Sequence, residues 1–186
     1  KTYSYKVSEV KGNAGDGITY DDKEYTVKVK VSYDQANGTM KAELADKDQK
    51  LAFANSYDTE TGIDLEGTKS LEGRTLKDGE FTFEVKDKAG KVVATGSNKS
   101  DGSISFNNKL NYKLSDLEKA DGSYESEKTY EYTVNEVIPE GATAENNYTV
   151  NGVTYDNSIF TVKVIVSYDQ ATGIMSAAFA EDSQEL

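Results

Sequence analysis

A glutamate continues the apolar face of an expected strand at two places in the chain. Alternate side chains of an extended segment point to the same face, so Glu9 continues the row of Tyr3 and Tyr5. The segment 128–137 repeats this pattern, and Glu136 there takes the place of Glu9. A carboxylate on a core face is costly unless another polar group satisfies it. Both glutamates are therefore candidates for buried chemistry.

A lysine and an asparagine also fall on apolar faces. Lys69 points the same way as Leu65 and Leu71, and Asn55 shares a face with two flanking aromatic residues. Burial favours the neutral, nucleophilic form of an amine and the protonated form of a carboxyl group. A protonated glutamate could hydrogen-bond the oxygen of an Asn amide, polarise its carbon and relay protons. The amine would then attack, ammonia would leave, and an amide cross-link would remain.

Each of these residues also has an ordinary explanation. A glutamate can meet solvent where a strand ends, a lysine can extend its amine to water, and an asparagine can open a turn. The combination, with the glutamate duplicated, favours the cross-link instead. Such a reaction happens once per domain, so we expect self-modification and not an enzyme that turns over a substrate.

The chain contains an internal repeat. The segment 26–40 recurs at 161–175 with 12 of 15 residues identical, at an offset of 135 (161 − 26), and 1–10 recurs at 128–137 at an offset of 127. The difference of eight residues (135 − 127) is a longer connection at 138–151 that contains the single proline. The chain therefore holds parts of two homologous domains.

The repeat boundaries predict the domain organisation. We expect 1–57 to be the C-terminal half of one β-sandwich repeat and 58–62 to be a short, semi-rigid linker. The remainder, 63–186, should be a second repeat that lacks its last strand, because the counterpart of 52–57 does not follow Leu186.

Strand signals are dense and predict an all-β fold. The segments 25–33 and 160–168 alternate β-branched or aromatic residues with polar ones, and each runs into an Asn-Gly or Thr-Gly hairpin connection. Further strands are expected at 80–85, 91–96 and 103–108, and one helical turn at 114–120. Many short strands with almost no helix predict Ig-like β-sandwich repeats in tandem.

Composition excludes several classes of function. Asp and Glu number 33 against 21 Lys and Arg, which gives a net charge of −12 and argues against nucleic acid and anionic membrane surfaces as partners. Cys and His are both absent, so the usual metal ligands and general bases are missing, and we expect neither a metal nor a cofactor. The segment 34–38 lacks the full ligand set of a calcium loop and is better explained as a hairpin turn. Asp21 and Asp156 could form a ligand rim, but strand-end packing explains them better.

The pattern of motifs resembles a known family. The segments GTKSLEGRTLKDGEFTFEV, YEYTVNEV and GVTYDNSIFTVKVIVSYD, with FANSY closing the preceding copy, resemble the streptococcal pilin isopeptide linkage domain of Gram-positive shaft pilins. The resemblance implies that Lys69 is a reactive lysine, that Glu9 and Glu136 promote isopeptide formation, and that Asn55 is a reactive asparagine. Lys69 and Asn55 would each take a partner from an adjacent repeat or chain, because a parallel pairing between them would need a longer crossover.

The resemblance also implies a structural role. We expect a stalk module of a sortase-anchored pilus or a repetitive adhesin, extracellular and attached to the cell wall. Its partners would be neighbouring repeats or pilin subunits, with head-to-tail strand donation from the 52–57 segment of one chain to the next. The alternative is a ligand-binding adhesin domain that recognises a host protein or glycan, for which the longer 138–151 connection is the only hint.

Overall fold

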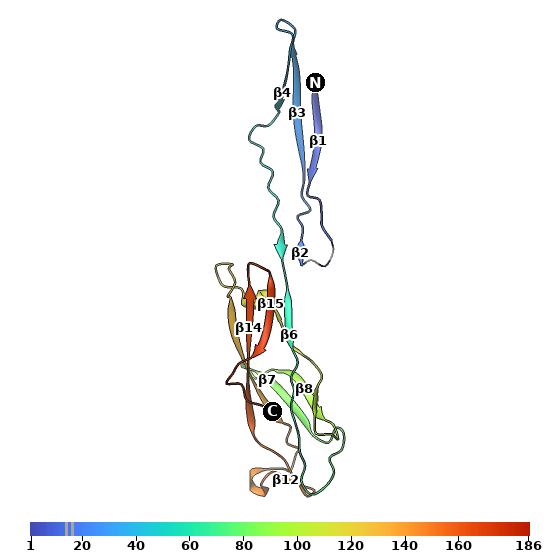
Figure 1. Ribbon diagram of the computed structural model, residues 1–186, viewed down its shortest axis with the longest axis vertical. Coiled ribbons are helices and arrows are strands. Elements are labelled where there is room, and N and C mark those ends of the chain that lie inside the picture. Colours follow the sequence, from blue (N-terminus) through green and yellow to red (C-terminus); the bar gives the residue numbers. More distant parts are fainter. Residues whose placement is uncertain (14, 16) are drawn as a thin grey trace. The chain divides into compact units, whose positions relative to one another are not determined.

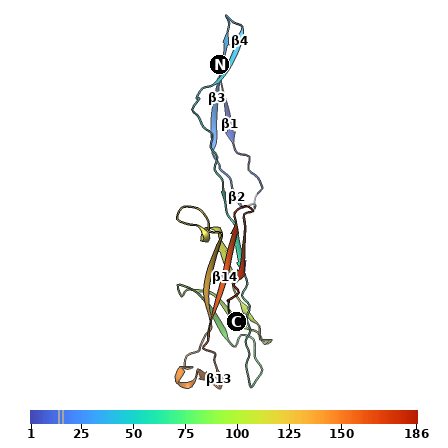
Figure 2. The same cartoon turned by 60° about the vertical axis from the view of Figure 1, so that its left-hand side comes forward.

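The computed structural model describes residues 1–13, 15 and 17–186 and divides the chain into two compact units, Lys1–Asp58 (unit 1) and Thr59–Leu186 (unit 2) (Figures 1 and 2). Almost all regular structure is β-strand, as the period-two pattern predicts. No helix among the described residues is long and apolar enough to cross a membrane.

Unit 1 is built on one antiparallel sheet in the order β1-β3-β4. Its strands are β1 (Thr2–Ser8), β2 (Ile18–Thr19), β3 (Glu24–Asp34), β4 (Thr39–Leu44) and β5 (Ser56–Tyr57). The short strands β2 and β5 pair with each other, which brings the segment before Tyr57 back to the region that follows β1. The turn between β3 and β4 is closed by Asp34, whose Oδ1 accepts hydrogen bonds from the backbone N–H groups of Ala36 and Asn37. This is the hairpin that the sequence predicts at 34–38.

Unit 2 contains two layers. A six-stranded antiparallel sheet has the order β15-β14-β11-β7-β8-β9, and a two-stranded sheet pairs β10 with β6. The elements are β6 (Glu60–Ile63), β7 (Thr82–Asp87), β8 (Val92–Asn98), β9 (Ile104–Phe106), β10 (Leu110–Lys113), η1 (Leu114–Leu117), β11 (Glu127–Glu136), η2 (Ala144–Asn146), β12 (Thr149–Val150), β13 (Val153–Thr154), β14 (Ile159–Asp169) and β15 (Ile174–Phe179).

The core of unit 2 lies between these two layers. Alternate valines of β14, namely Val162, Val164 and Val166, are at most 2% exposed and pack in one cluster with Leu110 and Tyr112 of β10. The large sheet therefore presents one apolar face to the small one, as expected for a β-sandwich. The 3₁₀-helix η1 is the helical turn expected at 114–120, shortened to Leu114–Leu117.

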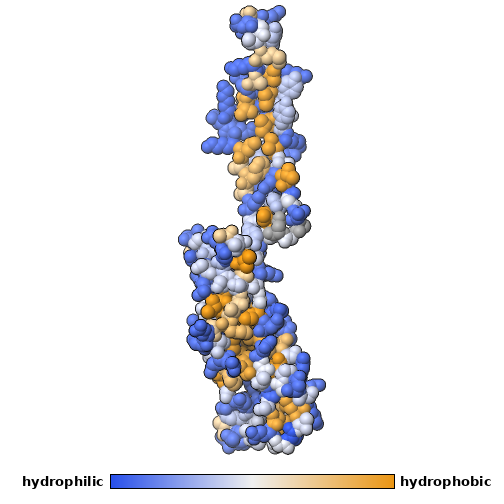
Figure 3. Space-filling model, in the orientation of Figure 1, coloured by the Kyte–Doolittle hydropathy of each residue, from blue (hydrophilic) through white to orange (hydrophobic). Residues whose placement is uncertain are grey.

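The same sequence is buried in unit 2 and open in unit 1. Tyr168 is 9% exposed and Met175 is 7% exposed, whereas their repeat equivalents Tyr33 and Met40 are 63% and 73% exposed. Hydrophobic side chains accordingly lie along the strands of unit 1 on the face shown in Figure 3. Among the described residues of unit 1, no second sheet covers β1, β3 and β4.

Two features differ from the sequence-based expectation. The segment expected to be a linker at 58–62 runs into strand β6. Residues Glu60–Ile63 pair with β10, and the alternate residues Thr61 and Ile63 are half-buried. The segment that carries Lys69 is extended but forms only an isolated bridge, Thr68 to Ser103, in place of the regular strand expected there. Its alternation nevertheless holds: Leu65 is buried, and Gly67, Lys69 and Leu71 are half-buried. The residues between them, Glu66, Thr68 and Ser70, are exposed.

Candidate functional site

A buried ion pair joins Lys69 and Glu136 in unit 2. Lys69 Nζ lies 2.7 Å from Glu136 Oε2, and the two side chains are 13% and 3% exposed. Glu136 ends β11 on the face of Tyr132 and Val134, both of which are buried. The structure therefore brings together a lysine and a glutamate that lie 67 residues apart in the sequence.

Backbone and aromatic contacts hold the lysine in this position. The N–H of Lys69 donates to the carbonyl of Gly102 at 2.7 Å, and the N–H of Thr68 donates to the carbonyl of Leu186 at 3.0 Å. The Lys69 ammonium also lies 4.5 Å from the centre of the Phe81 ring, which is 3% exposed. A cation over an aromatic ring in a site with little water is stabilised by the ring quadrupole. The alternation of side chains does not predict this role for Phe81, because its contact with Lys69 depends on tertiary packing.

The carboxylate of Glu136 is only partly satisfied. Its Oε2 accepts from Lys69 and, at 3.4 Å, from the backbone N–H of Asp156. Its Oε1 is buried and has no hydrogen-bond partner among the described residues. A cavity of about 60 Å³ is lined by Lys69, Glu136 and Asp156 together with Phe83, Phe160 and Leu186. An unsatisfied carboxylate oxygen beside a cavity leaves an unused acceptor for a small polar group.

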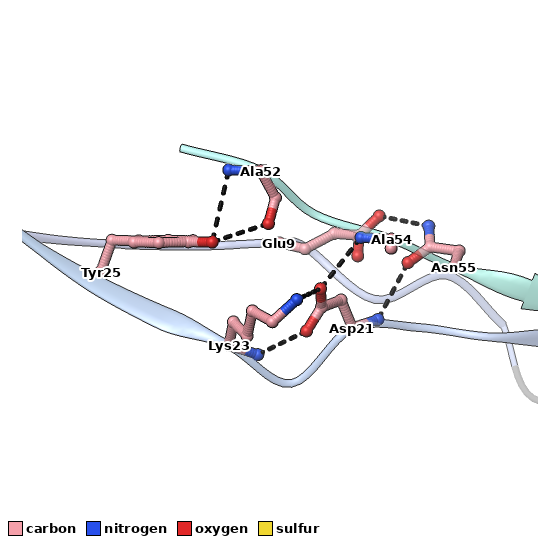
Figure 4. A network of polar contacts seen from close by, with 7 residues as sticks. All are labelled: Glu9, Asp21, Lys23, Tyr25, Ala52, Ala54 and Asn55. Atoms are coloured by element: carbon pink, nitrogen blue, oxygen red, sulfur yellow. Dashed lines mark hydrogen bonds and ion pairs between the residues drawn. The ribbon is translucent and has the colours of Figure 1, made fainter. Parts of the chain in front are cut away.

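In unit 1 the equivalent glutamate contacts an asparagine. Asn55 Nδ2 donates to Glu9 Oε1 at 2.6 Å (Figure 4). Glu9 is half-buried and Asn55 is exposed, in keeping with the open face of this unit. The second oxygen of Glu9, Oε2, is buried and has no partner among the described residues. The glutamates of both repeats thus keep one unused carboxylate oxygen.

The orientation of the Asn55 amide is fixed by a backbone donor. The N–H of Asp21 donates to Asn55 Oδ1 at 2.9 Å. Since a backbone N–H can only donate, the oxygen must face Asp21 and the nitrogen must face Glu9. This differs from the expectation that the glutamate would bind the amide oxygen. The carboxylate instead contacts the nitrogen, which is the leaving group of a transamidation.

Several contacts hold the segment that carries Asn55. The N–H of Ala54 donates to Asp21 Oδ2 at 2.9 Å, and the Tyr25 hydroxyl donates to the carbonyl of Ala52 at 2.7 Å. Tyr25 and Phe53 pack edge to face with ring centres 5.3 Å apart. These contacts fix the residues before the asparagine, and the pairing of β5 with β2 fixes those after it.

The Asp21 carboxylate carries a strongly shifted pKa. The N–H of Ala54 is the largest cause, followed by the Lys23 ammonium 2.9 Å from Oδ2, and together they lower the pKa of Asp21 from 3.8 to about 2. Hydrogen bonds that stabilise the charged form have this effect. Strand-end packing alone does not predict this role for Asp21. The signal in the sequence is its duplication as Asp156 at an offset of 135 (156 − 21).

The four expected site residues thus form two pairs. Lys69 contacts Glu136 within unit 2, and Asn55 contacts Glu9 within unit 1. Among the contacts of the described residues, the Glu136 carboxylate has a lysine amine but no asparagine amide, and the Glu9 carboxylate has an asparagine amide but no lysine amine. No group of three or more metal-ligating side chains occurs in the described part of the chain.

Comparison with known proteins agrees with the internal repeat. Residues 1–58 and 65–185 match the FctA family, described as the Spy0128-like isopeptide containing domain. The chain belongs to this family. The two matched segments correspond to the two units, so each unit derives from an FctA-type domain. Searches of curated proteins and of solved structures found no significant match.

Membership of the FctA family confirms the resemblance drawn from the motifs and the all-β fold. FctA domains are isopeptide-containing structural domains of the pilin type.

Proposed function

We propose that this chain is a shaft module of a Gram-positive surface pilus or repetitive adhesin, strengthened by autocatalytic Lys–Asn isopeptide bonds that a buried glutamate promotes. In this role Lys69 is the nucleophile, Asn55 supplies the acceptor carbon, and Glu136 and Glu9 transfer protons. One observation carries the proposal: equivalent glutamates hold a lysine amine at 2.7 Å in one repeat and an asparagine amide at 2.6 Å in the other.

Taken together through the repeat, the two contacts support one reaction site with a single carboxylate at its centre. A glutamate contacts the amine through one oxygen in unit 2 and the amide nitrogen through one oxygen in unit 1. Each glutamate also keeps a second oxygen unused, so a single carboxylate has room for both partners. Proximity of amine, amide and carboxyl in a site with little water supplies most of the acceleration of such a reaction.

The reaction balances without any further reagent. The Lys69 ammonium first passes a proton to the Glu136 carboxylate, which leaves a neutral amine and a carboxylic acid. The amine nitrogen bonds to the amide carbon of the asparagine, and the carbon–nitrogen bond to the amide NH₂ group breaks. The carboxyl group delivers its proton to that nitrogen, and ammonia leaves. The resulting carboxylate takes the second proton of the attacking nitrogen, so the new amide keeps one N–H and Glu136 ends as the carboxylic acid.

The missing partner of each pair comes from a neighbouring repeat or another pilin subunit. A groove lies beside Lys69 and is lined by residues of 64–68, 103–106 and 179–186. The segment 52–57 of another copy is the homologous strand, so it is the natural occupant of this position. Such head-to-tail strand donation is heterologous and can continue into a fibre.

A peptide experiment tests the chemistry directly. A synthetic peptide with the sequence of residues 51–57 is incubated with the Asn55→Ala chain, so that only the peptide supplies an asparagine. Intact mass spectrometry should show the sum of the two masses minus one ammonia, a loss of about 17 Da. Fragmentation should locate the bond at Lys69.

The matched control is the same peptide with Ala in place of its asparagine, which should bind without coupling. The proposal fails if the folded chain and the unaltered peptide, at saturating concentration, retain their separate masses. Coupling at a lysine other than Lys69 would also contradict it.

A covalent bond between strands suits a load-bearing role. The bond would carry tension that hydrogen bonds otherwise carry, and it would constrain the unfolded chain as a disulfide does, worth about 2–4 kcal/mol for a long loop. The near identity of the repeats also favours a shaft, because shafts consist of repeated modules. The repeats are nearly identical along 26–40 and 161–175. The role implies an extracellular position, attached to the cell wall.

The alternative, a ligand-binding adhesin domain, rests on the connection at 138–151. In the structure this connection is closed by its own hydrogen bonds: Asn146 Oδ1 accepts from the N–H groups of Thr143 and Thr149, and its Nδ2 donates to the carbonyl of Gly141. These contacts account for the conformation of the loop without a bound ligand. The shaft is therefore the function that the site supports best.

A further inference from the structure

An aspartate occupies the same position beside the glutamate in both repeats. Asp21 and Asp156 follow a tyrosine at an offset of 135 (156 − 21). Each carboxylate accepts a hydrogen bond from the backbone two residues on, from Lys23 at 3.0 Å and from Ser158 at 2.9 Å. Such an Asx turn fixes the local backbone. It therefore also fixes the direction of the aspartate's own N–H group.

In unit 1 this aspartate binds the asparagine segment at two points. Its backbone N–H donates to Asn55 Oδ1 at 2.9 Å, and its Oδ2 accepts from the N–H of Ala54 at 2.9 Å (Figure 4). The carboxylate is 6% exposed, although Lys23, with which it also pairs, is 56% exposed. Asp21 thus contacts both the amide oxygen of Asn55 and the backbone N–H of the preceding residue, Ala54.

In unit 2 the same N–H faces the glutamate. Asp156 N–H donates to Glu136 Oε2 at 3.4 Å, a long hydrogen bond, and Asp156 lines the cavity together with Lys69 and Glu136. The arrangement in unit 1 gives the place of an incoming amide. Its oxygen would accept from Asp156 N–H, and its nitrogen would donate to Glu136, as Asn55 does with Asp21 and Glu9.

The chemistry of the reaction gives this N–H a role. When an amine attacks an amide carbon, an electron pair moves onto the amide oxygen, and a fixed N–H donor at that oxygen stabilises the developing charge. The glutamate cannot do this while it contacts the amide nitrogen. We propose that the backbone N–H of Asp156 is the oxyanion donor for the bond formed by Lys69, and that the Asp156 carboxylate positions the incoming strand.

This assignment rests on the proposed cross-linking function and gives Glu136 and Asp156 different roles in the reaction. Glu136 transfers protons to and from the two nitrogens, the attacking amine and the leaving group. Asp156 N–H donates a hydrogen bond to the amide oxygen. In unit 1, Asp21 is the equivalent donor for an amine that attacks Asn55. The carboxylate of either aspartate acts on the strand and not on the reacting atoms, so it is a positioning group.

The test uses the Asn55→Ala chain and the peptide of residues 51–57. One variant carries at position 156 the α-hydroxy acid counterpart of aspartate, which replaces only the N–H by an oxygen. A second, Asp156→Asn, keeps the N–H and an oxygen that can accept hydrogen bonds. The maximal coupling rate and the half-saturating peptide concentration are measured separately by intact mass.

Removing the N–H should lower the maximal rate about 100-fold or more, the usual cost of losing one oxyanion donor. The half-saturating concentration should change by only a few-fold. Asp156→Asn keeps the N–H but weakens the acceptor for the incoming strand, so it should raise the half-saturating concentration by a larger factor than it lowers the maximal rate. This is the reverse of the pattern expected for the ester, and a general loss of structure at position 156 would not give it.

The outcomes separate the two proposals. If the parent chain does not couple at all, the cross-linking function itself is wrong, and this assignment falls with it. If the parent chain couples and the ester variant matches its maximal rate, the cross-link stands and the oxyanion assignment is overturned.

Discussion

The Lys69 amine lies 2.7 Å from Glu136, and Glu136 occupies in its repeat the position that Glu9 occupies beside Asn55. One carboxylate position therefore receives the nucleophile in unit 2 and the acceptor amide in unit 1. Each pair shows the geometry for one partner of the reaction.

Replacing Glu136 by Gln should stop coupling of the 51–57 peptide. The amide has nearly the same shape but cannot relay a proton, and such relays contribute about 10²–10⁴-fold to a rate. Intact mass after a fixed time should show at least a 100-fold slower reaction. Glu131→Gln, on the exposed side of the same strand, is the matched control and should couple normally. Full coupling by Glu136→Gln would give the carboxylate no role in proton transfer.

Two inactive chains should complement each other. Lys69→Arg keeps the asparagine half, and Asn55→Ala keeps the lysine half, so neither alone can form covalent species. Mixed together, they should give a covalent dimer on a denaturing gel and no higher species, because each chain retains one reactive group. The unaltered chain should give a ladder, because each molecule carries both reactive groups and a heterologous contact need not close. A ladder from the Lys69→Arg chain alone would contradict the assignment of the nucleophile.

Equivalent core substitutions should have unequal costs in the two units. Val164 is fully buried, and Val164→Ala should lower the free energy of unfolding of unit 2 by about 2 kcal/mol, from lost transfer energy and a new cavity. Its repeat equivalent Val29 is only half-buried, so Val29→Ala should cost less than half as much. Chemical denaturation of each variant gives the comparison. Equal costs would mean that the face of Val29 is covered in solution.

Acid should release the asparagine segment of unit 1. Because the folded-state pKa of Asp21 is lowered from 3.8 to about 2, its hydrogen bond from Ala54 stabilises the segment above pH 4 and is lost as the pH falls through 2. The chemical shift of the Ala54 amide proton, followed by NMR, should titrate with a midpoint near 2. Asp21→Asn should abolish this titration. Asp22→Asn, one residue further, should leave it in place, and a midpoint near 3.8 in the parent chain would refute the contact.

The repeat and the alternation of side chains determined much of this protein in advance. Strand backbone geometry alone places Glu136 with Tyr132 and Val134, and Lys69 with Leu65, so the sequence was sufficient to identify polar groups on apolar faces. The duplicated segments 26–40 and 161–175 were sufficient to predict two related all-β units.

Only the tertiary structure decided which of these groups meet and how. Lys69 and Glu136 lie 67 residues apart, and no local pattern predicts a contact that depends on how two extended segments pack. The orientation of the Asn55 amide was likewise open until the N–H of Asp21 placed its oxygen, because an amide can present either end to a carboxylate. The tertiary structure also decided which apolar side chains are buried. Tyr33 and Tyr168 lie in nearly identical segments, yet only Tyr168 is covered by a second layer. A sequence encodes which face is apolar, but the segment that covers this face comes from elsewhere in the fold.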